Sequence, residues 1–65
     1  MPIVTIEMLE GRSIAQKKQL VEGITTEFVK IGTNAEKVTI IFRDIAKHNL
    51  ATGGKLNSES PARPL

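Results

Sequence analysis

The chain of 65 residues contains no cysteine, tryptophan or tyrosine, and it has one histidine and two phenylalanines. Without cysteine, the protein can form neither disulfides nor thiolate metal sites. The single histidine, His48, and the seven carboxylates do not fall at the spacing of metal ligands, so we expect no metal site. Small domains usually need a disulfide, a metal or oligomerisation to be stable. Of these three, the composition leaves self-association.

The sequence also lacks a long apolar run and a concentration of positive charge. No segment approaches the roughly 20 apolar residues of a membrane span, and the N-terminus has no basic region followed by a continuous apolar segment. The nine lysines and arginines are interspersed with seven acidic residues. Phe28 and Phe42 are too few aromatic residues for a base-stacking surface. We therefore expect a soluble, cytoplasmic protein that binds neither membranes nor nucleic acid.

The side chains of residues 3–9 alternate between two faces, which predicts a strand. Val4, Ile6 and Met8 form one wholly apolar face. Pro2 directly precedes this strand. A proline is tolerated at the start of a strand because its missing N–H breaks no hydrogen bond of the ladder there. The strand position permits Pro2 but does not by itself explain it.

Ser13 and Gln16 have the spacing of a capping box, which predicts a helix beginning at Ile14. Gly32 is a natural end for this helix. Apolar residues recur along it at spacings of three and four, as in an amphipathic helix. They are Leu20, Ile24, Phe28 and Ile31, with Val21 alongside.

A second strand is predicted at residues 38–43, where nearly every side chain is apolar or β-branched. Strand, helix and strand form a β-α-β unit, in which the two strands are parallel. Turn-forming residues over 44–56 predict a short C-terminal hairpin. We therefore predict one α+β domain over residues 1–56, followed by a tail at 57–65 that is flexible unless a neighbouring chain holds it.

A single helix packs on one side of a two-stranded sheet and leaves the other side open. The second strand nevertheless carries Ile40, Ile41 and Phe42 in succession, which places apolar side chains on both faces. Burying both faces requires apolar surface from outside the subunit. The sequence therefore predicts that other copies of the chain cover the second face.

Several features occur together: Pro2 directly after Met1, the segment Met-Leu-Glu-Gly-Arg-Ser at 8–13, and Thr-Gly-Gly-Lys at 52–55. With a single helix between two strands, this combination resembles the 4-oxalocrotonate tautomerase family over about residues 2–56. The resemblance implies a β-α-β subunit that dimerises into a four-stranded sheet with two helices. It further implies that three such dimers form a hexamer.

The resemblance also implies a mechanism without a cofactor. Met1 is removed, and the secondary amine of Pro2 acts as the general base. The reference pKa of a free α-amine is near 8, and an apolar pocket with nearby cations lowers it, so we expect a neutral amine at pH 7. By the same resemblance, Arg12 of a neighbouring subunit holds a carboxylate of the small substrate. The backbone amide near Leu9 orients a water or a carbonyl oxygen, and Leu50 excludes water.

Two positions depart from the best-studied members of that family. Thr39 replaces an arginine that binds a substrate oxygen, and Leu50 replaces an aromatic residue. Arg43 shares a strand face with Thr39 but lies about 13 Å further along, at roughly 3.3 Å per residue. It either reaches a differently placed substrate or forms a surface or intersubunit ion pair. Because one charge-assisted contact is typically worth about 1.5–3 kcal/mol, we expect low activity or a substrate with one carboxylate.

These observations favour a tautomerase that converts 2-hydroxymuconate or another small enol-pyruvate acid between its enol and keto forms. Two alternatives stay open. One is hydration or dehalogenation of an unsaturated acid at the same site. The other is a non-catalytic subunit that needs a partner chain to complete its pocket.

Overall fold

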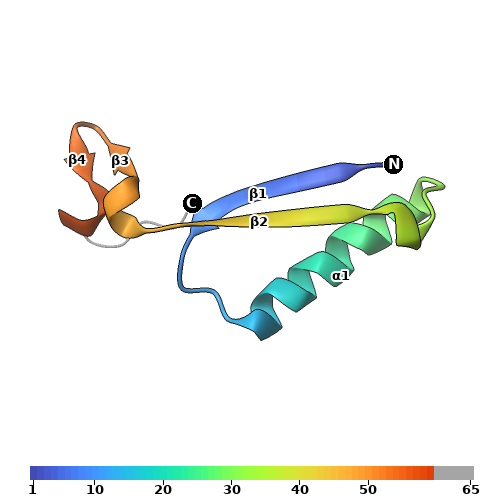
Figure 1. Cartoon of the computed structure of the whole chain (residues 1–65). Helices are drawn as coiled ribbons and strands as arrows, with labels where there is room; N and C mark the ends of the chain where they lie inside the picture. The colour runs from blue at the N-terminus through green and yellow to red at the C-terminus, as the bar shows by residue number, and fades with distance from the viewer. Residues whose placement is uncertain (60–65) are drawn as a thin grey trace.

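The computed structural model describes residues 1–59, so the predicted tail at 57–65 is described only as far as Glu59; residues 60–65 lie outside the described residues. The chain forms, in order, β1 (Ile3–Leu9), α1 (Ile14–Lys30), β2 (Thr39–Ile45), β3 (Ala51–Thr52) and β4 (Lys55–Leu56) (Figure 1). Single turns of 3-10 helix occur at Ala35–Lys37, Lys47–Asn49 and Asn57–Glu59.

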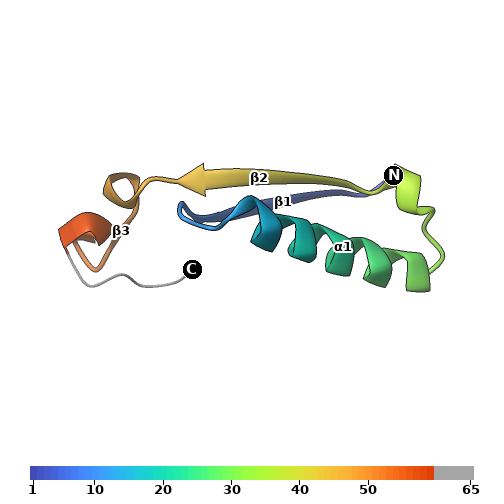
Figure 2. The ribbon, with the colours of Figure 1, turned by 90° about the horizontal axis from the view of Figure 1, so that it is seen from below.

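The two long strands pair in parallel, from Ile3 opposite Thr39 to Leu9 opposite Ile45. α1 lies on one side of this two-stranded sheet, as Figure 2 shows. Alternate strand residues are half-buried on the helix side: Val4, Ile6, Met8, Ile40 and Phe42. The predicted β-α-β unit is confirmed, and the bounds of β1 are those predicted from the alternation.

The capping residues of α1 act as the sequence predicts. The hydroxyl of Ser13 accepts from the Gln16 N–H at 3.1 Å, and the Gln16 side-chain oxygen accepts from the Ser13 N–H at 2.9 Å. At the other end, Gly32 adopts a positive φ of 98°, and the Thr33 N–H donates to the carbonyl of Phe28 at 3.0 Å. This is a Schellman motif, which a glycine makes at little cost. Within residues 1–59, no helix has the length and apolar character needed to cross a bilayer.

β2 begins one residue later and ends two residues later than the predicted strand at 38–43, because its pairing with β1 continues to Ile45. The added residue Asp44 lies on the helix side, where its carboxylate accepts from the Lys17 ammonium at 2.6 Å. The same ammonium lies 5.6 Å from the centre of the Phe42 ring. The charge of Asp44 ended the apolar pattern in the sequence, although this ion pair allows the strand to continue.

Beyond β2, residues 46–59 form a separate arm. β3 and β4 pair antiparallel across a turn in which Gly53 and Gly54 have φ values of 62° and 81°. Positive φ at both central residues is the requirement of a type I′ hairpin turn, and the predicted hairpin is confirmed. Figure 1 shows the hairpin past the end of β2, away from α1.

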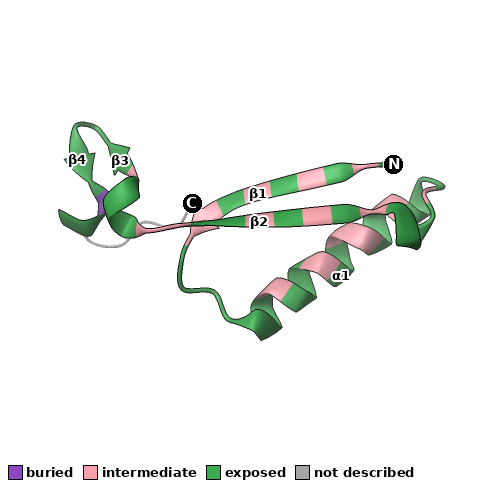
Figure 3. Cartoon of the chain, in the orientation of Figure 1, coloured by how far each residue is buried: buried purple, intermediate pink, exposed green. Residues whose placement is uncertain are grey.

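The described residues include no buried hydrophobic side chain. Ile3 and Ile41, on the sheet face opposite the helix, are 61% and 42% exposed. Figure 3 shows half-buried residues along the seam between sheet and helix, at the N-terminus, in the loop between α1 and β2 and near the base of the arm. The radius of gyration is 14.8 Å, against about 11 Å expected for a compact chain of this length. The second sheet face is therefore uncovered, as the sequence predicts for one copy alone.

Candidate active site

Pro2 and Thr39 lie side by side at the start of the sheet. The carbonyl of Pro2 accepts from the Thr39 N–H at 3.0 Å, and the next residue, Ile3, is the register partner of Thr39. Pro2 is half-buried and Thr39 is exposed. The hydrogen bond fixes the backbone at Pro2, and the ring restricts φ, so the direction of the proline nitrogen is well defined.

Leu9 and Arg12 lie at the opposite end of the sheet. Leu9 is the register partner of Ile45, and the Glu10 N–H donates to the carbonyl of Ile45 at 2.9 Å. Gly11 then turns the chain with a φ of 120°, and the exposed Arg12 follows directly before the helix cap. At roughly 3.3 Å per strand residue, Pro2 and Leu9 are about 23 Å apart.

The two remaining candidates lie on the outer sheet face and in the arm. Arg43 is exposed, in register with Glu7 and four residues after Thr39, so it lies away from Pro2. Leu50 is half-buried at the start of the hairpin, and its carbonyl accepts from the Asn57 N–H at 2.7 Å. Of the predicted substrate-binding residues, Thr39 alone therefore lies beside Pro2 within a single chain.

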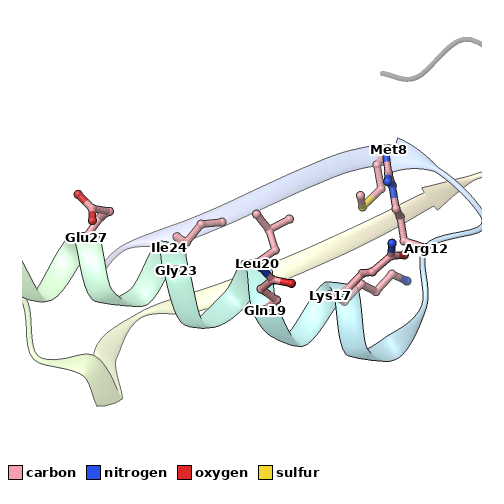
Figure 4. Close-up of a pocket in the computed structure, with 9 residues that line it drawn as sticks. Met8, Arg12, Lys17, Gln19, Leu20, Gly23, Ile24 and Glu27 are labelled. Atoms are coloured by element: carbon pink, nitrogen blue, oxygen red, sulfur yellow. The ribbon is translucent and has the colours of Figure 1, made fainter.

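An open groove runs along α1 on the side of β1 (Figure 4). Arg12 and Lys17 line its end near Met8, and the apolar residues Leu20 and Ile24 line its middle. The groove thus places a guanidinium at the end of an apolar surface. It contains none of the residues at the Pro2 end of the sheet.

One chain does not bring Pro2 and Arg12 together. An arginine side chain is far shorter than the seven-residue strand that separates them. A site that uses both residues must therefore take them from two copies of the chain. In the part of the chain described, no cluster of three or more histidine or acidic side chains is placed to hold a metal ion.

Sequence reasoning missed Lys17 and Asn57. Lys17 joins α1 to β2 through Asp44, whereas the sequence showed only one lysine among several on a helix. Asn57 is 6% exposed, although it follows a polar turn and stands at the start of the predicted tail. The first three residues of that tail, Asn57–Glu59, form a 3-10 turn. No periodicity marks Asn57, so the sequence carried no signal for its burial.

The profile of the family described as tautomerase enzyme matches residues 2–59. The chain belongs to the tautomerase family. Its family membership indicates an isomerase that catalyses a tautomerase-type reaction. The match begins at Pro2 and ends at Glu59, so it includes both ends of the sheet and the arm.

Individual relatives agree with this assignment. The chain is 43% identical over 61 residues to a 2-hydroxymuconate tautomerase of Bacillus subtilis, covering 91% of this chain and 97% of the relative. It resembles the crystal structure of YwhB, a homologue of 4-oxalocrotonate tautomerase, at a TM-score of 0.84 and 36% identity, covering 92% and 100% of the two chains. It also resembles a fused 4-OT described as an asymmetric trimer, at a TM-score of 0.76 and 30% identity, covering 85% of this chain and 46% of that one.

Proposed function

We propose that this member of the tautomerase family converts 2-hydroxymuconate, or another small enol-pyruvate acid, between its enol and keto forms, with Pro2 as the general base and no cofactor. The position of Pro2 carries the proposal. It directly precedes β1, its carbonyl accepts a hydrogen bond from the Thr39 N–H, and the family match starts at the same residue.

Pro2 acts as a base only when its nitrogen is an amine. With Met1 attached, the nitrogen is an amide and has essentially no basicity. Met1 is 88% exposed, which leaves it accessible to an aminopeptidase. Once Met1 is removed, the nitrogen lone pair takes the proton of the enol hydroxyl, and the resulting ammonium returns a proton to carbon. The product is an isomer of the substrate, so the reaction consumes no co-reactant.

Arg12 of a second copy would bind the carboxylate of the substrate. A guanidinium offers two parallel N–H donors that match a carboxylate, and the contact is stronger in a pocket that excludes water. The backbone amide near Leu9 would orient a water or a carbonyl oxygen. Leu50 supplies apolar surface that keeps the pocket dry. Because Arg12 and Leu9 lie together at the end of β1 opposite Pro2, one neighbouring copy can contribute both.

The same fold supports an assembly of several copies. Among residues 1–59, β1 and β2 pair with each other and with no other strand, so each has a free edge. Two-stranded sheets are marginal alone, and pairing two copies would give a four-stranded sheet with two helices. We propose such dimers, three of which form a hexamer. The absence of buried hydrophobic side chains from residues 1–59 supports self-association, since a single copy lacks a core of its own.

The proposal is tested by measuring intact mass and enol ketonisation on one purified sample. We expect the mass to show loss of Met1, and ketonisation of 2-hydroxymuconate or phenylenolpyruvate above the buffer rate. Pro2→Ala keeps a terminal amine but loses the rigid secondary amine, and it should abolish the excess rate. A processed protein that ketonises neither enol above the buffer rate would contradict the proposal. It would favour a subunit that needs a different chain to complete its pocket.

A further inference from the structure

The end of the groove near Met8 carries two cations, Arg12 and Lys17. Lys17 lies in the first turn of α1, and its ammonium pairs with the Asp44 carboxylate at 2.6 Å. Arg12 lies just before the helix cap, is exposed, and forms no ion pair within residues 1–59. Figure 4 shows its side chain alongside Met8. One acidic side chain therefore lies near two basic ones and is paired with only one of them.

Asp44 lies where Arg12 could also bind it. Asp44 is the register partner of Met8, so the Cα atoms of these two residues are about 5 Å apart on neighbouring strands. The Arg12 side chain runs alongside Met8, on the same end of the sheet. A planar guanidinium also matches a carboxylate with two parallel N–H donors, which an ammonium does not offer. An unpaired Asp44 would therefore attract Arg12.

Two contacts hold Lys17 in place on Asp44. The backbone N–H of Lys17 donates to the Ser13 carbonyl at 3.0 Å, which anchors the residue in the helix. Its ammonium also lies 5.6 Å from the centre of the Phe42 ring, within the range of a cation–π contact. Arg12 precedes the helix and has neither anchor. Pairing of Lys17 with Asp44 therefore leaves the Arg12 guanidinium without a carboxylate partner.

We propose that Lys17 keeps Asp44 from pairing with Arg12, so that the Arg12 guanidinium stays available to a carboxylate from outside the chain. Lys17 is thus a positioning residue, since it acts through Asp44. That the outside carboxylate belongs to the substrate rests on the proposed function. The competition between Lys17 and Arg12 for Asp44 does not depend on which reaction the protein catalyses.

Steady-state kinetics with phenylenolpyruvate measures how available Arg12 is. Lys17→Met removes the ammonium and leaves Asp44 free to bind Arg12. We expect KM to rise about three- to sixfold with little change in kcat, because a partly exposed ion pair would leave only a fraction of Arg12 available. Lys17→Arg keeps a cation on Asp44 and should retain the wild-type KM. Lys30→Met removes the other paired lysine, at the far end of α1, and is the matched control.

Removing the Asp44 charge distinguishes this role from a structural one. Asp44→Asn leaves no carboxylate to capture Arg12, so its KM should not rise. Adding Asp44→Asn to Lys17→Met should return KM to the wild-type value. If the ion pair served only to stabilise the fold, Asp44→Asn would raise KM as much as Lys17→Met does, and the double variant would not recover. Either of these results would overturn the proposal.

NMR of the Arg12 side-chain Nε–H group provides a readout that needs no catalysis. In Lys17→Met this signal should shift and exchange with water more slowly than in wild type, and Asp44→Asn in the same chain should reverse both changes. Lys17→Gln provides the same comparison if Lys17→Met does not fold. A signal that is unchanged when Lys17 is replaced would overturn the proposal. A wild-type protein inactive on either enol would instead overturn the proposed function, and the NMR comparison would still decide which cation Asp44 binds.

Discussion

At the scale of single residues, the proposed reaction depends on the nitrogen of Pro2 and on the residues next to it. Thr39 holds the Pro2 carbonyl through its backbone, and its side chain is neutral. On the same sheet face, Ile3 and Ile41 add apolar surface. The adjacent β2 positions carry no cation, and in the proposed mechanism Arg12 of another copy supplies the charge that binds the substrate.

The protonation of Pro2 predicts the pH dependence. The amine must be neutral to accept a proton, so kcat/KM should fall as pH is lowered through the pKa of the amine and level off above it. Burial in an apolar pocket disfavours the charged amine, so this pKa should lie below the reference value near 8. A pH-rate profile of the processed protein measures it. A profile without an acidic limb would exclude an amine base.

The neutral side chain of Thr39 leads to a prediction about which substrate the protein prefers. With one arginine per site, a substrate with one carboxylate, such as phenylenolpyruvate, should be preferred over the dicarboxylate 2-hydroxymuconate. Thr39→Arg should raise kcat/KM for the dicarboxylate about 10- to 100-fold, the value of one charge-assisted contact. Thr39→Val removes the hydroxyl without adding charge and serves as the control. Equal effects of both variants on both substrates would contradict this explanation.

At the scale of secondary-structure elements, the sequence predicted most of the fold. The bounds of β1, the start of α1 and the hairpin turn followed from local rules: alternation, a capping box and paired glycines. The end of β2 did not, because Asp44 continues the strand through an ion pair with Lys17 from a distant segment. The strand register places Pro2 and Arg12 at opposite ends of the sheet in one chain. Local patterns thus gave candidate site residues, whereas their distribution between copies was expected from the family resemblance alone.

The glycine that ends α1 leads to a prediction about stability. Gly32 has a φ of 98°, and a Cβ at this position would meet no atom within 4 Å. The cost of Gly32→Ala is therefore conformational, and we expect a loss of about 1–2 kcal/mol in the free energy of unfolding. Urea denaturation measures this loss. Gly32→Asn, which tolerates the left-handed region better, should lose less; a larger loss for asparagine would show that the strain is not the cause.

At the scale of the whole molecule, the chain is elongated, with extents of 44 × 22 × 14 Å, and buries no hydrophobic side chain within residues 1–59. Such a chain has too little core to be stable alone. Assembly explains both the uncovered sheet face and the projecting arm. It also explains how residues at opposite ends of β1 can serve one site.

The uncovered sheet face provides a prediction about assembly. Ile41 is 42% exposed in one copy, so Ile41→Lys would cost little in an isolated chain. In an assembly that covers this face, the lysine would bury a charge and weaken association. We expect the melting temperature of the variant to fall and to depend more steeply on protein concentration than that of wild type. Ile41→Val keeps an apolar side chain and is the matched control. If the lysine variant and wild type had the same melting temperature, this face would be exposed to solvent in the assembly.

In the proposed mechanism, Pro2 of one copy and Arg12 of another form one site. Refolding a mixture of Pro2→Ala and Arg12→Gln chains tests it directly, because each variant alone should be inactive or nearly so. Random assembly of equal amounts should restore activity at about a quarter of the sites, those that combine the intact Pro2 of one variant with the intact Arg12 of the other. A mixture no more active than the two variants measured separately would contradict a site shared between copies.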